Sequence, residues 1–286
     1  MGLLARLRVG AVLTKDSLLL IRHHPRLVLF PILSGLFGIA FLGLFLGVTF
    51  GLAAIAPEGG AIVGLLLAYL ALTFVSSLFT AGLVHQTREV LAGGEISLRD
   101  GLDAAWNRKT PLFVWSVIAA TVGVVINMIE GSDSSVGRLF AVIFSVAWTL
   151  MTFFIIPVIV FERPTTTEMF KRSASTFKRT YGETPISLIA IQIVGLLVAL
   201  PLIGSGLYLA MTGTVFGLLG IGLFLFGIVL SFIVSQTLQG VVKTSLYFYA
   251  EEGIKPEEFD NVDFDSLSEA QDSGLRSSRR PVRGEV

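Results

Sequence analysis

The chain has 286 residues, of which 53% are hydrophobic and 15% are charged, and its formal net charge is zero. A soluble domain carries about 25% charged residues, so this composition excludes a soluble globular protein and indicates a membrane protein. The absence of cysteine excludes disulfides, thiolate catalysis and cysteine-based metal sites.

Six apolar runs are long enough to cross a membrane, because a spanning helix needs about 20 predominantly apolar residues. The predicted spans are residues 27–56, 61–84, 111–129, 138–161, 186–211 and 214–235. No secretory cleavage pattern follows the first run, so we expect it to remain as an uncleaved span. The sequence thus predicts an all-α polytopic membrane helical bundle within residues 1–250.

The first two runs carry glycines at helical spacing. Gly43, Gly47 and Gly51 share one face of the first run, and Gly60 and Gly64 share one face of the second. Small residues allow helix backbones to approach closely. Packing between the two runs of one hairpin is the favoured interpretation, and a dimer seam is the alternative.

A short amphipathic helix is predicted before the third run. It begins at a capping pattern, Ser97-x-x-Asp100, and carries Trp106 on its apolar face. Arg108 and Lys109 follow it directly. Such a helix lies in the membrane interface, with its ring among the acyl chains and its cations beside lipid phosphates.

A second helix of this kind is predicted before the fifth run, beginning at the capping box Thr165-x-x-Glu168. Its apolar stripe contains Phe170, Phe177 and Tyr181. Its cations are Lys171, Arg172, Lys178 and Arg179. We expect the rings to set the depth of the helix in the membrane and the cations to contact lipid headgroups. An ordinary solvated basic loop is the alternative.

Polar residues inside the spans are few. Ser76, Ser77 and Thr80 line part of the second run. Asn127 and Gln192 lie toward the middle of the third and fifth runs, and Pro201 predicts a bend or break in the fifth. These residues support an alternative function, a small-solute transporter or channel with a cavity near all three. Ordinary hydrogen bonding between helices is the favoured interpretation, because neither Asn nor Gln ionises.

The end of the membrane domain is more polar. The sixth run is expected to continue as a polar-faced helix through Gln236, Gln239 and Lys243 to about residue 249. Residues 251–286 are polar and are expected to form a disordered cytoplasmic tail. The tail is either solvated or a docking segment for a protein partner.

The order of the predicted elements indicates an internal repeat, and the placement of the cations indicates an orientation in the membrane. The sequence of amphipathic helix, proline and two spans occurs three times, with residues 2–22 as a weaker first copy. The loops at the far ends of the hairpins hold one cation, Arg138, and the other twenty lie on the opposite side. Because cations resist translocation, we expect a cell-membrane protein with both termini in the cytoplasm.

The sequence contains no catalytic or metal-binding constellation. His23 and His24 point apart on a helix, and His85 stands alone. Hydrolase, metalloprotease and phosphate-loop motifs are absent. We therefore expect no catalytic residue, metal, cofactor or nucleic-acid partner, and a lipid-active enzyme is the least favoured alternative.

Three stretches resemble an uncharacterised family of prokaryotic integral membrane proteins. They are TKDSLLLIRHHPRLVLFPIL (14–33), SLRDGLDAAWNRKTPLFVWSVIAATVG (97–123) and AVIFSVAWTLMTFFIIPVIVFERPTTTEMFKRSASTFKRTYGE (141–183). The resemblance covers most of residues 10–250 and implies a membrane fold without an assigned activity. The helix pattern is also similar to the membrane part of glycerophosphodiester phosphodiesterases, whose soluble catalytic domain has no counterpart in this sequence.

These observations together predict a non-enzymatic integral membrane protein. Its basic interfacial helices are expected to organise lipid or a partner. The expected partners are the lipid bilayer and its anionic lipids, with a protein partner through the tail as a further hypothesis.

Overall fold

The computed structural model describes residues 3–56, 59–131, 134–180, 184–213 and 215–252. All regular secondary structure in these ranges is helical. Tyr181 and most of the predicted tail lie outside the described residues.

The helices form three successive groups, each with one leading helix and one hairpin. The first group is α1 (Leu3–His23), the 3-10 helix η1 (Pro25–Val28), α2 (Leu29–Ile55) and α3 (Gly60–Leu91). The second is α4 (Leu98–Trp106), α5 (Lys109–Glu130), α6 (Ser135–Met151) and α7 (Ile155–Glu162). The third is α8 (Thr166–Arg179), α9 (Thr184–Ala210) and α10 (Val215–Glu252). The element order therefore follows the predicted threefold pattern.

Six helical stretches within the described ranges are long and apolar enough to cross a membrane. They are Pro25–Ile55, Gly60–Leu91, Lys109–Glu130, Ser135–Glu162, Leu188–Ala210 and Phe216–Glu251. This confirms the all-α polytopic bundle. The predicted extension of the sixth span is also confirmed, because α10 continues as one helix to Glu252. Helix α9 continues through Pro201 without a break.

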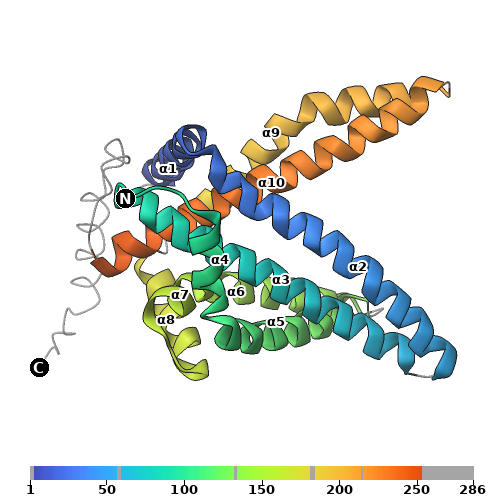
Figure 1. The fold of residues 1–286 in the computed structure, drawn as a ribbon, viewed down its shortest axis with the longest axis horizontal. Coiled ribbons are helices and arrows are strands. Elements are labelled where there is room, and N and C mark those ends of the chain that lie inside the picture. Colours follow the sequence, from blue (N-terminus) through green and yellow to red (C-terminus); the bar gives the residue numbers. More distant parts are fainter. Residues whose placement is uncertain (1–2, 57–58, 132–133, 181–183, 214, 253–286) are drawn as a thin grey trace, which may run out of the picture.

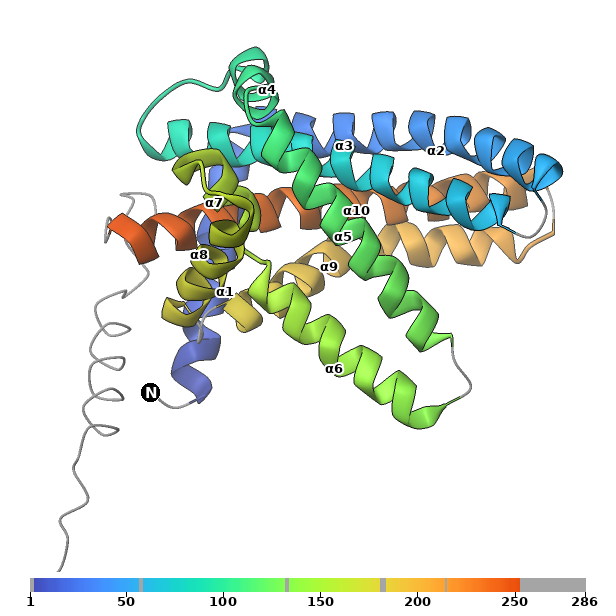
Figure 2. The ribbon, with the colours of Figure 1, turned by 90° about the horizontal axis from the view of Figure 1, so that it is seen from below.

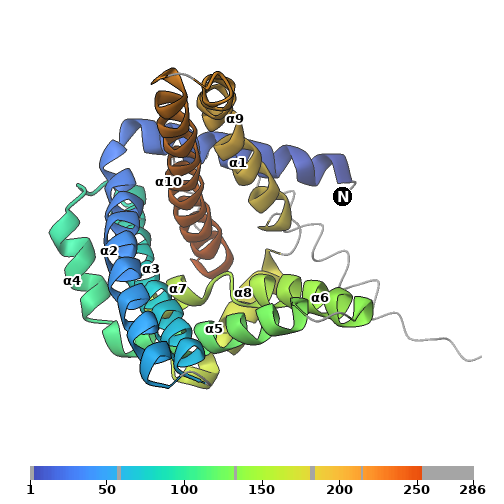
Figure 3. The same cartoon turned by 90° about the vertical axis from the view of Figure 1, so that its right-hand side faces the viewer.

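The three hairpins meet at one end of the molecule and diverge toward the other, as Figures 1 and 2 show. We call the end where they meet the base, formed by α1, α4, α7, α8 and the last turns of α3 and α10, and we call the diverging parts the arms. Viewed from the arms (Figure 3), the hairpin of α9 and α10 stands apart, whereas α5 lies beside α3. In every candidate span, no more than 28% of the apolar window is buried inside the protein. The arms therefore present apolar side chains that suit contact with acyl chains.

The hydrophobic core lies at the base. One cluster joins α1, α3, α5, α7, α8, α9 and α10 around fully buried side chains such as Leu112, Phe154 and Met169. A second cluster packs Phe30 and Leu27 against Leu83 of α3. The base thus resembles the interior of a soluble domain, with close packing that holds the three hairpins together.

The glycine prediction is only half correct. A Cβ on Gly64 would lie 2.6 Å from the Cα of Thr49, and one on Gly60 would overlap the Leu52 carbonyl, so both glycines permit close packing of α3 on α2. The other row faces open space, because a Cβ added at Gly43, Gly47 or Gly51 would meet no atom within 4 Å. Packing of this row inside the hairpin is therefore wrong, because it lies on the outer surface of α2.

Helix α6 ends earlier than the predicted fourth span. Turns at residues 152–154 separate it from α7. The Ser173 hydroxyl donates to the Met151 carbonyl oxygen at 2.7 Å and accepts from the Phe154 amide at 3.2 Å. Pro157 lacks the N–H that would bond the residue 153 carbonyl in a continuous helix. The break turns α7 into the base, where it meets α8.

Candidate functional site at the base of the bundle

Helix α8 begins at the predicted capping box. The Thr165 amide donates to the Glu168 carboxylate at 2.9 Å, and the Thr165 hydroxyl donates to it at 2.7 Å. The amide first, and the hydroxyl second, hold the pKa of Glu168 below its usual value. The capping box thus satisfies main-chain donors in the first turn of α8.

The apolar stripe of α8 faces the protein. The Phe170 ring lies 6.0 Å, centroid to centroid, from both Trp115 and Trp148, and Phe177 packs against the same core cluster. Both side chains are half-buried, so the core of the base covers part of each ring, and contact of the remaining surface with acyl chains stays a prediction. Trp106 on α4 is different, since 54% of it is exposed.

The four cations of α8 divide into two pairs. Arg172 lies 3.3 Å from the Glu162 carboxylate of α7, and Arg179 lies 3.4 Å from the Glu251 carboxylate of α10. These ion pairs tie α8 to its neighbours. Lys171 and Lys178 are exposed and form no ion pair within the described ranges.

Glu162 and Glu251 each hold more than one partner. The Tyr247 hydroxyl donates to Glu162 at 2.7 Å, and the Thr176 hydroxyl donates to Glu251 at 2.9 Å. The Arg179 guanidinium also donates to the main chain at residue 250, at 3.1 Å. Both carboxylates are thus committed to contacts that join α7, α8 and α10.

A further set of cations lies beside α4. Partial burial, and then repulsion by Arg163, lower the pKa of Arg108. The Lys109 ammonium lies 5.0 Å from the centroid of the Trp106 ring. Arg163 ends α7 in the left-handed conformation, with φ at 53°. The base therefore brings Arg108 and Arg163 close enough to repel, which favours an anion nearby.

A cavity of about 330 Å³ lies where the three hairpins meet. Its hydroxyl groups come from Ser76, Ser77, Thr80, Thr149 and Thr152. The α10 side contributes Gln236, Gln239 and Lys243. Trp115, Trp148 and several apolar side chains complete the wall, which contains no carboxylate. The cavity is thus polar, with lysine as its one ionisable group.

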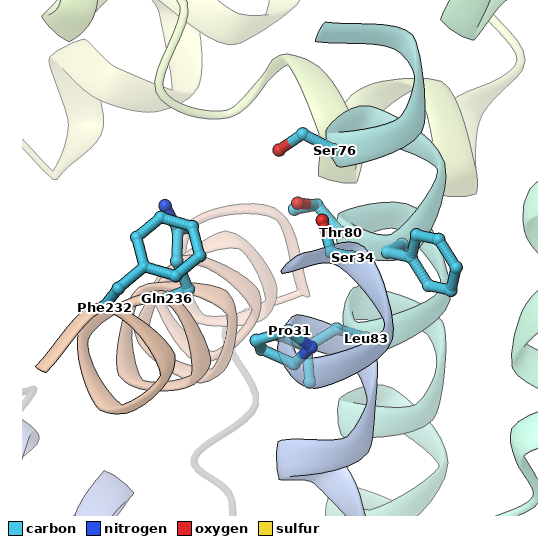
Figure 4. A pocket seen from close by; sticks show the side chains of 8 residues that line it. Pro31, Ser34, Ser76, Thr80, Leu83, Phe232 and Gln236 are labelled. Atoms are coloured by element: carbon cyan, nitrogen blue, oxygen red, sulfur yellow. The ribbon is translucent and has the colours of Figure 1, made fainter. Parts of the chain in front are cut away.

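A small crevice of about 10 Å³ adjoins this cavity between α2, α3 and α10. Ser76, Thr80 and Gln236 line both spaces. In Figure 4 the two hydroxyls point toward α10, with Gln236 across from them, and Pro31 and Ser34 stand on the α2 side. The polar surface therefore continues from the cavity into the contact between the first and third hairpins.

The residues predicted to mark a cavity lie elsewhere. The Asn127 amide is exposed and donates to the Gly123 carbonyl of its own helix at 2.9 Å. Gln192 and Pro201 are also exposed on α9. None of the three lines the cavity. Periodicity gives no depth and no facing partner for a polar residue, whereas Gln236, Gln239 and Lys243 recur on one face of α10 and do line this cavity.

One family model matches a range of residues that includes every residue lining the cavity. The model of a family of unknown function (DUF6159) matches residues 58–256, which run from the start of α3 past the end of α10. No curated protein matches the chain, so the similarity to glycerophosphodiester phosphodiesterases finds no support. Within the described residues, no group of three or more histidines and carboxylates is placed to hold a metal ion.

Proposed function

We propose that the chain, which belongs to the DUF6159 family of unknown function, is a non-enzymatic membrane protein that gathers anionic lipids at its base. The observation that carries the proposal is the pair of exposed lysines, Lys171 and Lys178, on a helix fixed to the base. The apolar arms set the membrane plane. The lysines then lie beyond the arms, at the level of the lipid headgroups.

The orientation of the protein is part of the proposal. Arg138 is near the far tip of the second hairpin, whereas Arg108, Lys109 and the cations of α8 are at the base. The positive-inside rule then places the base in the cytoplasm and the arms across the cell membrane. Anionic lipids of the cytoplasmic leaflet would be the natural ligands of the base.

The ion pairs of α8 decide which of its cations can be replaced without disturbing the fold. Arg172 and Arg179 hold α8 on the base, so replacing them would disturb the fold as well as the surface charge. Lys171 and Lys178 can be replaced alone. Each cation near an anionic surface contributes about 1 kcal/mol, so the pair accounts for up to about thirtyfold in lipid association.

The test measures lipid retained by the full chain. The protein is purified in neutral detergent from vesicles of phosphatidylcholine and phosphatidylglycerol, and the retained lipids are quantified by mass spectrometry. K171Q/K178Q is expected to lower the ratio of phosphatidylglycerol to phosphatidylcholine. R138Q is the control, because it removes a cation from the opposite end. An unchanged ratio in the double variant, or an equal fall in R138Q, would overturn the proposal.

A second candidate function is passage of a small solute. The polar cavity at the meeting point of the hairpins favours it. Against it, the arms diverge beyond the cavity, and Asn127 and Gln192 face outward from them. Lipid association therefore remains the better-supported proposal.

A further inference from the structure

We propose that the cavity at the base binds a phosphate-bearing anion, with Lys243 as its counter-charge. The cavity volume of about 330 Å³ falls within the range of small-molecule sites. The inference concerns a site inside the bundle, separate from the exposed lysines of α8. It stands even if surface association with anionic lipid fails.

The charge of the cavity is uncompensated. The Lys243 ammonium lies 4.8 Å from the centroid of the Phe153 ring and forms no ion pair within the described ranges. Glu162 and Glu251, on the neighbouring parts of α7 and α10, are held by Arg172 and Arg179. The Lys243 side chain is half-buried; a cation held partly away from water is stabilised by a counter-charge, and the described cavity wall supplies none.

The hydrogen-bonding groups suit an oxyanion. Gln236, Gln239 and Lys243 follow one face of α10, and Ser76 and Thr80 follow one face of α3. No hydrogen bond within the described residues uses these side chains. Two amides, two hydroxyls and an ammonium thus offer donors from two sides, as the oxygens of a phosphate require.

The donors from α3 and α10 are held in place by close packing. Gly240 sits against the Leu83 side chain, and any Cβ at Gly240 would overlap it. This contact holds α10 close to α3 at the depth of Gln239 and Lys243. The binding groups therefore stand on rigid helices, which favours a built site.

The same chemistry fits two sources of phosphate. A lipid headgroup would place its phosphate near Lys243 and its acyl chains between the diverging arms, past Leu188 and Trp148 at the cavity wall. A free phosphate would occupy the polar part of the cavity alone. Both require Lys243, and they differ in whether acyl chains contribute to affinity.

Two of the three tryptophans of the chain, Trp115 and Trp148, line the cavity. Tryptophan fluorescence of the full chain in neutral detergent therefore reports on occupation of the cavity. The probes are inorganic phosphate, dihexanoyl phosphatidic acid and, as the zwitterionic comparison, dihexanoyl phosphatidylcholine. We expect a saturable change with at least one of the first two, and a weaker one with phosphatidylcholine.

Variants locate the site. K243Q is expected to weaken binding about ten- to a hundredfold, as for loss of a charged hydrogen-bonding partner, and K243R to retain part of the affinity. Q239L keeps the lysine and is expected to weaken binding less than K243Q does. It replaces K243Q in the test if K243Q does not fold. K171Q/K178Q should leave the titration unchanged.

The outcomes separate the alternatives. Binding of phosphatidic acid without inorganic phosphate assigns a lipid headgroup, and equal binding of both assigns a free phosphate; either supports the site. Absence of a saturable change with both probes would overturn it. So would parent-like binding by K243Q, or by Q239L if K243Q is unfolded. Weakening in K171Q/K178Q alone would assign the anion to the surface instead.

Discussion

Replacing Gly64 with alanine is expected to loosen the hairpin of α2 and α3. The added Cβ would lie 2.6 Å from the Cα of Thr49, a main-chain atom that cannot rotate away. The helices would have to separate by roughly 0.8 Å to restore ordinary contact, and a gap of that size forfeits about a quarter to a half of the dispersion energy between facing atoms. Overpacking of this kind costs about 1–3 kcal/mol.

Gly47→Ala is the matched control for Gly64→Ala. It makes the same chemical change in the same hairpin, but no atom lies within 4 Å of the new Cβ. Alanine is also favoured over glycine in a helix, by up to about 1 kcal/mol. We therefore expect Gly47→Ala to leave stability unchanged or slightly raised.

The assay is thermal unfolding of both variants in one neutral detergent, followed by near-ultraviolet circular dichroism. The midpoint of Gly64→Ala should fall, and that of Gly47→Ala should not. An equal fall in both variants would refute the packing argument. If the fall for Gly47→Ala also depended on protein concentration, the exposed glycine row of α2 would be covered by a second copy.

Other perturbations test the base. Ser173→Ala should destabilise the α6–α7 break by about 1–3 kcal/mol, because it leaves two main-chain groups unpartnered; amide exchange at the break as slow as in the parent would contradict this. The Thr165 amide lowers the pKa of Glu168, so this carboxylate stabilises the fold fully above the usual glutamate pKa and loses its effect as pH falls through the lowered value. Glu168→Gln should flatten that acid limb in a pH series of unfolding midpoints, and an identical limb would count against the assignment. Gln239→Cys should react with a small polar maleimide in proteoliposomes, and Gln192→Cys should react slowly because it faces acyl chains; equal rates would contradict this placement.

The spans and helix starts were predictable because their signals are local. Apolar length identifies a membrane helix without knowledge of its neighbours. The capping box at Thr165 and the cap at Ser97 are also local, since each satisfies main-chain donors within one turn. The same holds for the extension of α10 beyond residue 235.

Whether protein or lipid covers a given helix face was not predictable, because this depends on residues far away in the sequence. The stripe of Phe170 and Phe177 has the pattern of an interfacial helix, yet Phe170 packs on tryptophans from α5 and α6 and Phe177 is half-buried against the same core cluster. The row at Gly43, Gly47 and Gly51 has the pattern of a packing seam, yet it faces outward. An amphipathic pattern indicates that one face of a helix is apolar, but it does not indicate whether lipid or protein covers that face.

The contrast between arms and base restricts where a fixed site can lie. The described ion pairs that join different helices, Arg172 with Glu162 and Arg179 with Glu251, are both at the base. The arms diverge and bury little of their surface. A binding site needs side chains held by neighbouring packing, and only the base provides that on every side. Lys243 meets this condition, because α10 is tied to α8 by Glu251 and fits closely on α3 at Gly240. If Lys243 binds a phosphate as proposed, the arms would hold the base at the depth where a phosphate of the lipid headgroups, or one dissolved beside them, reaches that lysine.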